Sequence, residues 1–248
     1  MIELKTAREI EMMRRAGRIV AEVLQELHQA VKPGVTTRAL DAMAQAGIER
    51  RGGKPAFLGY RGFPATLCTS VNDQVVHGIP GDRVLRAGDI IGLDLGAIVD
   101  GYYGDAAITV PVGAVTPEVA RLLDVTREAL LRGIAQAVAG SRLENISAAV
   151  QHHAEEAGFA VVRQFVGHGI GRRLHEDPAV PNFGRPDHGP RLTAGMVLAI
   201  EPMVNMGGPE VKVLADGWTA VTKDHSLSAH FEHTVAITER GPEILTLP

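Results

Sequence analysis

The sequence predicts an α+β fold, in which helices cover one face of a mostly antiparallel sheet. Hydrophobic periodicity gives the order helix, helix, strands, and then the same order again. Glycine spacing supports a repeat, because Gly34 and Gly140 are 106 residues apart, as are Gly52 and Gly158. Each of these glycines bounds the second helix of its half. We therefore expect a structural duplication.

The first half opens with two helices. Thr6-Ala7-Arg8-Glu9 is a capping-box pattern, and the apolar residues after it recur at steps of three and four as far as Val31. Lys32-Pro33-Gly34 ends this helix, and a second helix is expected from about Thr37 to Arg51. Between Pro55 and Val112, glycines alternate with short Val, Ile and Leu runs, which indicates strands and turns.

The second half repeats this pattern. Thr116 as N-cap and Pro117 at the first helical position predict a third helix, running to about Val138. The stretch SRLE at 141–144 is interpreted as a capping box that begins a fourth helix. The remainder, Phe159 to Leu247, returns to strands and glycine turns.

Composition excludes several classes of protein. No linker divides the chain, so we expect a single domain, 1–248, with halves of about 1–113 and 114–248. The 25 basic and 29 acidic residues give a net charge of −4, which argues against a DNA-binding protein. A single cysteine, Cys68, suits a reducing compartment. Neither a signal peptide nor a membrane-spanning run is visible, so we expect a cytoplasmic protein without a membrane partner.

Two aspartates, Asp94 and Asp105, lie in apolar runs of the kind that become buried strands. Asp100-Gly101 is a strong two-residue hairpin turn, which would place Asp105 opposite Gly96. The two aspartates would then be diagonal neighbours on one face, with Cβ atoms roughly 7–8 Å apart. That separation suits one or two metal ions between them. The alternative is a solvent-facing polar side of an amphipathic strand.

Further candidate ligands distinguish these alternatives. Glu201 ends one apolar strand and Glu232 begins another, while His168 and His175 lie in a glycine-rich loop. Four carboxylates and one imidazole are a suitable donor set for a pair of divalent ions. Shared carboxylates would keep the two ions roughly 3.5–4 Å apart, the spacing of a two-metal hydrolase. A structural protein with an acidic sheet face would not account for the loop histidines.

Five stretches together carry a resemblance to a known family: VNDQVVHGIP, GDIIGLDLGAIVDGYYGDAA, GHGIGRRLHEDP, AGMVLAIEPM and DGWTAVTKDHSLSAHFEHTV. The chain resembles, over nearly its whole length, the type I methionine aminopeptidases of the pita-bread metallopeptidase family. The resemblance implies two pseudo-twofold halves around a central antiparallel sheet covered by helices. It also implies removal of the N-terminal methionine from newly made proteins and peptides, favouring small second residues.

The resemblance implies a dinuclear metal site with all five ligands present. Asp105 and Glu232 would bridge the two ions, Asp94 would chelate one of them, and His168 with Glu201 would hold the other. The ions would be two of Co²⁺, Mn²⁺, Fe²⁺ or Zn²⁺, and would activate a water for hydrolysis.

The resemblance also implies the catalytic roles. Glu201 would be the proton shuttle. His77 would contact the substrate backbone and assist the departing amine, and His175 would stabilise the oxyanion.

An apolar pocket for the methionine side chain is implied as well. Its expected wall is made of Tyr60, Phe63, Cys68 and Trp218. Phe57 and Leu174 stand where cysteine and phenylalanine are frequent in the family, which leaves the shape of the pocket open.

The remaining polar residues carry weaker expectations. Asn72 and Ser228 lie where relatives bind a monovalent cation. His152 and His153 are expected on the surface. His230 shares the Glu232 face of a regular strand, which makes it a candidate to support the ligands.

Two rivals stay open on the same fold. One is a proline-specific peptidase, although such relatives generally carry an extra N-terminal domain. The other is a non-catalytic binding protein, although such relatives lose ligands and gain basic surface. A monomer and a transient association with the ribosome complete the expectations.

Overall fold

The computed structural model describes residues 2–248, and its element order is helix, helix, strands, repeated once. Four α-helices and one short 3₁₀ turn lie in the described residues: α1 (Ala7–Ala30), α2 (Thr37–Arg50), η1 (Tyr60–Gly62), α3 (Pro117–Ala135) and α4 (Leu143–Glu156). None of these helices is long and apolar enough to cross a membrane.

One large sheet forms the centre of the molecule. Its strands follow the order β1 (Lys54–Pro55), β4 (Ile90–Val99), β5 (Tyr102–Pro111), β14 (Glu232–Thr238), β9 (Val197–Ile200), β7 (Gly167–Gly169) and β8 (Glu176–Val180). At its side, β2 (Leu67–Val71) pairs with β4 and β15 (Gly241–Ile244) pairs with β14. All of these pairings are antiparallel, as the sequence predicts.

Two small sheets complete the fold. They are β13 (Ser228–His230), β10 (Met203–Asn205) and β6 (Ala160–Val161), and separately β11 (Val211–Val213), β12 (Ala220–Thr222) and β3 (Gln74–Val76).

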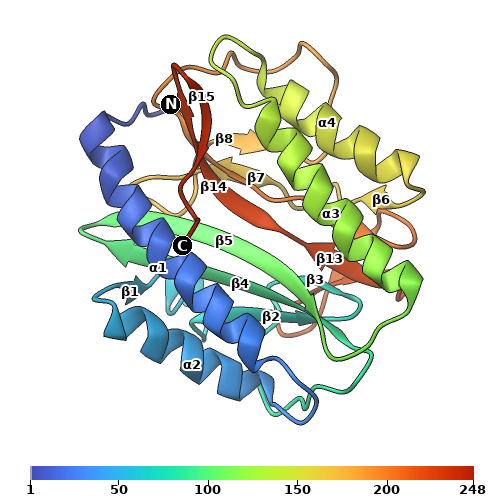
Figure 1. Ribbon diagram of the computed structural model, residues 1–248. Helices are drawn as coiled ribbons and strands as arrows, with labels where there is room; N and C mark the ends of the chain where they lie inside the picture. The colour runs from blue at the N-terminus through green and yellow to red at the C-terminus, as the bar shows by residue number, and fades with distance from the viewer. Residues whose placement is uncertain (1) are drawn as a thin grey trace.

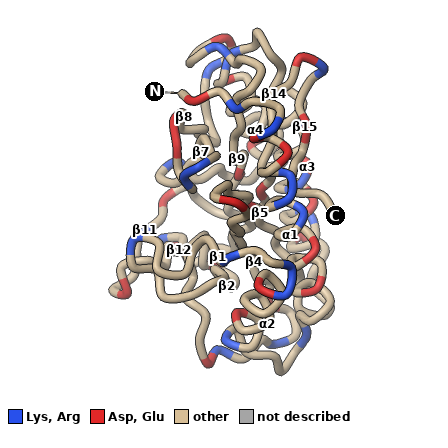
Figure 2. The backbone as a smooth tube through the Cα atoms, turned by 90° about the vertical axis from the view of Figure 1, so that its left-hand side faces the viewer, with Lys and Arg blue, Asp and Glu red and all other residues tan. Residues whose placement is uncertain are grey.

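The helices lie against one side of the large sheet. α1 and α2 pack on β2, β4 and β5, whereas α3 and α4 pack on β9 and β14 (Figure 1). Figure 2 shows α1 and α3 on one side of the sheet, and β11 and β12 on the other. The helix-covered face is the core, so polar side chains on the other face are free to form a site.

The β4–β5 hairpin has the predicted register. Asp100 and Gly101 have positive φ angles of 51° and 81°, which a two-residue turn of this kind requires. Gly96 therefore pairs with Asp105. Because side chains alternate along a strand, Asp94 and Asp105 share one face, and Leu93 and Leu95 enter the core.

Helix starts agree with the sequence at α1 and α3. Thr6 and Glu9 form the predicted capping box of α1. Thr116 accepts a hydrogen bond from the Val119 amide, with Pro117 as the first residue of α3. This helix ends at Ala135, one turn earlier than predicted.

The capping box expected at the start of α4 is wrong. The N-cap residue is Arg142, whose side chain does not cap the helix, and Ser141 Oγ accepts from Asn145 Nδ2 instead. The first amides of α4 find tertiary partners: Leu143 donates to the Pro190 carbonyl and Glu144 to that of His188. With these partners in place, no side-chain cap is needed.

Candidate metal centre

Five neighbouring strands each contribute one of the predicted metal ligands. Asp94 lies on β4, Asp105 on β5, Glu232 at the start of β14, Glu201 directly after β9, and His168 on β7. These strands are adjacent in this order in the large sheet. The topology therefore gathers residues from 94 to 232 at one place.

The donor atoms form two overlapping groups. Asp105, His168 and Glu232 each offer a ligand atom within 4.8 Å of the others, and so do Glu201, His230 and Glu232. His168 Nε2 lies 3.5 Å from Glu201 Oε1 and 4.0 Å from Asp105 Oδ2. Glu232 belongs to both groups, which is the arrangement that a carboxylate shared by two ions requires.

The carboxylates lack the partners that buried acids need. Asp94 Oδ1, Asp105 Oδ1 and Glu232 Oε1 are buried without a hydrogen-bond partner among the described residues. Burial raises the pKa of Asp94 to about 7 and, with nearby acidic groups, raises the pKa values of Asp105 and Glu232 well above their usual range. Burial also raises the pKa of Glu201 well above that of an ordinary carboxyl. Unpaired buried carboxylates are costly, and divalent cations supply the missing charge, so these residues fit a metal centre.

The tautomer of His168 also suits a ligand. Its Nδ1 lies 3.0 Å from the Gly169 carbonyl oxygen, which can only accept a hydrogen bond. Nδ1 therefore carries the proton, and Nε2 presents its lone pair to Glu201 and Asp105. Burial lowers the pKa of His168 to about 3, so the ring is neutral at pH 7.

The remaining predicted site residues surround the same place. A cavity of about 140 Å³ opens onto the carboxylates, and its other lining residues are Phe57, Tyr60, Arg61, Phe63, Cys68, His77, Leu174, His175 and Trp218. The rings of Phe63 and Trp218 meet edge to face, with centroids 5.1 Å apart. The acids thus lie at the end of a largely apolar pocket.

Two histidines flank the carboxylates at the cavity. His175 stacks on Tyr60, whose hydroxyl lies 2.9 Å from His175 Nδ1. His77 is held edge to face between Phe165 and Trp218. Burial lowers the pKa of His77 to about 4, and burial together with the Arg61 charge lowers the pKa of His175. Both rings can therefore donate an N–H as neutral groups.

Two residues of the site were not assigned to it from the sequence. Arg61 lines the cavity and lies over the Tyr60 ring, at a backbone φ of 50° that no local pattern signals. His230 joins Glu201 and Glu232, where strand alternation had made it only a candidate.

The surface position expected for His153 is wrong. His153 is half-buried, and its Nε2 is buried without a hydrogen-bond partner. His153 faces inward because the helix turns it toward the core side, whereas its neighbour His152 is exposed.

The expected monovalent-cation residues lie side by side. The Ser228 amide donates to the Asn72 carbonyl oxygen at 3.0 Å. The Asn72 side chain is used internally: its Oδ1 accepts from the Ile90 amide and its Nδ2 donates to Asp89.

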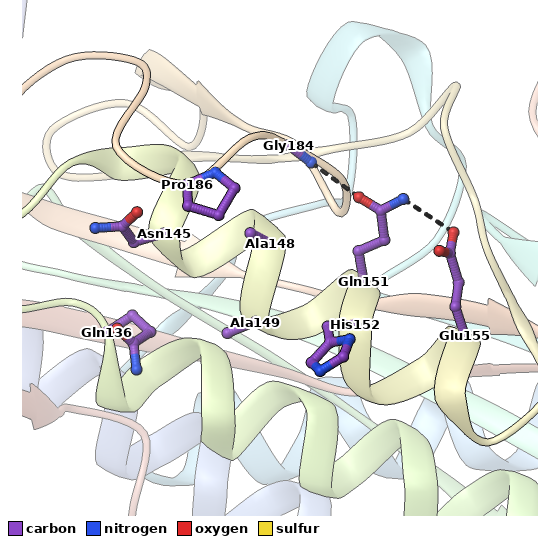
Figure 3. A pocket seen from close by; sticks show the side chains of 9 residues that line it. All are labelled: Gln136, Asn145, Ala148, Ala149, Gln151, His152, Glu155, Gly184 and Pro186. Atoms are coloured by element: carbon purple, nitrogen blue, oxygen red, sulfur yellow. Dashed lines mark hydrogen bonds between the residues drawn. The ribbon is translucent and has the colours of Figure 1, made fainter.

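A wider cavity lies elsewhere, between α4, the end of α3 and the loop at 184–186 (Figure 3). Its volume is about 490 Å³. Gln151 accepts from the Gly184 amide and donates to Glu155, so its polar groups satisfy one another. Both groups of potential metal ligands found among residues 2–248 lie instead at the smaller cavity, which is therefore the candidate site.

Comparisons with known proteins agree with this geometry. The family described as "Metallopeptidase family M24" matches residues 11–239. Methionine aminopeptidase 1 of Bacillus subtilis is 54% identical over 246 residues, which is 99% of each chain. The crystal structure of methionine aminopeptidase from Thermotoga maritima covers all of both chains with a TM-score of 0.99 and 47% identity.

More distant structures share the fold alone. The prolidase from Pyrococcus furiosus has a TM-score of 0.79 at 24% identity, and 99% of this chain corresponds to only 65% of that protein. The pita-bread fold expected from the sequence is confirmed by these likenesses. The family match and the full-length identity together mean that the chain belongs to metallopeptidase family M24, among its methionine aminopeptidases.

Proposed function

We infer that this chain is a methionine aminopeptidase, which removes the N-terminal methionine of newly made polypeptides. One observation supports the inference most strongly. This chain is 54% identical to a methionine aminopeptidase over 99% of its length, and its acids and an imidazole lie at the end of an apolar pocket. We further propose a preference for small second residues, a cytoplasmic location, a monomeric state and transient association with the ribosome.

Five residues would hold two divalent ions, of Co²⁺, Mn²⁺, Fe²⁺ or Zn²⁺. Asp105 and Glu232 would be shared, Asp94 would hold one ion, and His168 with Glu201 the other. Support comes from the buried carboxylate oxygens without partners and from the lone pair that His168 Nε2 presents. When bound, such ions lower the pKa of a water so that it becomes a nucleophile near neutral pH. A monovalent cation beside Asn72 and Ser228 stays a prediction.

Glu201 is the proposed proton shuttle. It follows β9 directly, its side chain is 12% exposed, and it lines the cavity together with the other four proposed ligands. Burial raises the pKa of its carboxyl, which favours accepting a proton from the attacking water and passing it to the departing amine.

His77 and His175 act on the peptide bond. As neutral imidazoles they can donate an N–H to the scissile carbonyl region and to the substrate backbone. The Tyr60 hydroxyl fixes the orientation of His175. Tyr60, Phe63, Cys68 and Trp218 form the apolar wall for the methionine side chain.

Chelation and add-back test the proposed function. We expect hydrolysis of a Met-Ala-Ser peptide with Co²⁺, Mn²⁺ or Fe²⁺, and loss of hydrolysis after complete chelation. Activity that survives removal of all divalent ions would contradict it. His77→Ala should keep the metal content and lose turnover, so a lower metal content in this variant would refute the role given to His77.

A further inference from the structure

His230 lies beside the proposed metal ligands, but it is not one of the five and no role has been given to it. It ends β13, two residues before Glu232, and is only 3% exposed. Its Nε2 is buried without a hydrogen-bond partner in the described residues. Buried polar atoms are nearly always paired, so this nitrogen indicates a contact that the working site completes.

The backbone of His230 is held from both sides. Thr109 Oγ1 accepts from the His230 amide at 2.9 Å and donates to the His230 carbonyl at 2.8 Å. On the other side, His230 pairs with Met203 of β10. These contacts fix the backbone from which the imidazole extends, as a positioning group requires.

This nitrogen lies close to two of the acids. His230 Nε2 lies 3.5 Å from Glu201 Oε2, and Glu232 also offers an oxygen within 4.8 Å of both. The other oxygen of Glu201, Oε1, lies 3.5 Å from His168 Nε2. The Glu201 carboxylate is therefore placed between two imidazoles, with one oxygen toward each.

The two imidazoles differ in what they can offer. His168 donates its Nδ1 proton to the Gly169 carbonyl, so its Nε2 can only accept. Because the Glu201 carboxylate also only accepts, a cation is needed between the two. His230 Nε2 can carry a proton and donate it as a hydrogen bond. A separation of 3.5 Å is slightly longer than a formed bond, as is common before a catalytic site is loaded.

We propose that His230 is a positioning residue: it donates a hydrogen bond from Nε2 to Glu201 Oε2 and holds that carboxylate in the orientation from which it shuttles the proton. This inference rests on the proposed function of the site. The hydrogen bond leaves Oε1 directed toward His168 and the metal, and it lowers the freedom of the carboxylate to rotate away. His230 itself contacts neither the ion nor the substrate.

Four variants separate this role from a structural or ligating one. His230→Leu removes the donor, while His230→Gln replaces it with an amide N–H of similar reach. His233→Gln is the matched control, because His233 neighbours Glu232 but its ring contacts Thr246 instead of the acids. Thr109→Val removes both hydrogen bonds to the His230 backbone and keeps the side-chain volume. This variant tests the same role if His230→Leu does not fold.

The measurements are kcat and KM for Met-Ala-Ser, bound metal by plasma mass spectrometry, and the melting temperature. We expect His230→Leu to lower kcat by about 10- to 100-fold, the usual effect of removing a partner of a metal-site carboxylate. KM and metal content should stay unchanged. His230→Gln should recover most of kcat. Thr109→Val should lower kcat less than His230→Leu does, and His233→Gln should have the kcat of the wild type.

Three results would overturn the proposal. They are a wild-type kcat in His230→Leu, a loss in His230→Gln as large as that in Leu, or a loss of bound metal in His230→Leu, which would make His230 a ligand. If the wild type fails to cleave the peptide, the proposed function fails instead. Crystal structures of the metal-loaded wild type and His230→Leu then still decide whether Glu201 turns when the imidazole is absent.

Discussion

Asp94→Asn changes the stability of the metal-free protein in a direction that the buried carboxylate dictates. Burial raises the pKa of Asp94 in the folded protein to about 7, from an ordinary value of 3.8. For an acid with a raised folded pKa, the favourable contribution to folding is complete below the unfolded pKa and is lost as pH rises through the folded pKa. The wild type therefore loses stability between about pH 4 and pH 7, and asparagine, which has no proton to lose, removes this loss.

The size of the effect follows from the pKa difference. Each unit of pKa difference corresponds to about 1.4 kcal/mol, so the window from pH 5 to pH 8 contains about 3 kcal/mol from Asp94. We expect the metal-free variant to gain that amount relative to the wild type across this window. The gain corresponds to a shift of roughly 1 M in the urea midpoint.

Urea denaturation of both chelated proteins at pH 5 and pH 8 measures this difference. Subtracting the wild type from the variant cancels the titration of groups that do not interact with Asp94. His230, Asp105 and Glu232 interact with Asp94, so they contribute to the measured difference. With divalent ions bound we expect the sign to reverse, because asparagine then replaces a proposed ligand and the variant becomes the less stable protein. A difference between variant and wild type that is independent of pH without metal would refute the reasoning.

A second aspartate provides the control for this experiment. Hydrogen bonds from Gly208 and Ser226 lower the pKa of Asp224 to about 2. Its contribution to stability is present above pH 3.8 and is lost only as pH falls toward 2. The difference between Asp224→Asn and the wild type should therefore be constant from pH 5 to pH 8.

Two further predictions concern the Tyr60 hydroxyl and the Lys5–Glu176 ion pair. Tyr60→Phe removes the hydroxyl that lies 2.9 Å from His175 Nδ1. This change should lower kcat by about two- to tenfold with unchanged metal content. An unchanged kcat would show that His175 does not need the Tyr60 hydroxyl to hold its orientation. Lys5→Met leaves the buried Glu176 without its ion-pair partner and should lower the free energy of unfolding by about 3–5 kcal/mol. The double variant Lys5→Met/Glu176→Leu should recover most of the lost free energy of unfolding, measured by urea denaturation. A Lys5→Met variant as stable as the wild type would disprove the pairing.

Local patterns were sufficient for the central hairpin. The Asp100-Gly101 turn needs two positive φ angles, and this pair of residues supplies them with little strain. The turn fixes the register, and alternation then places Asp94 and Asp105 on one face. Both steps depend on residues close together in the sequence, which is why the sequence alone predicts them.

The rest of the site depends on contacts between distant segments. Periodicity does not bring His168 and Glu201 to the aspartates; the strand order does, and the sequence indicated that convergence through family resemblance. The start of α4 was misjudged for the same reason, since carbonyls of 188–190 replace the side-chain cap. Alternation alone predicts that His230 lies on the Glu232 face, but its approach to Glu201 depends on the pairing of distant strands.

Anomalous diffraction from crystals grown with Mn²⁺ or Co²⁺ tests the central claim most directly. The strand order brings Asp94, Asp105, His168, Glu201 and Glu232 to one cavity, and we predict two anomalous peaks there, with Asp105 and Glu232 contacting both. Fully loaded crystals with no peak between these side chains, or with peaks only elsewhere on the molecule, would contradict the account.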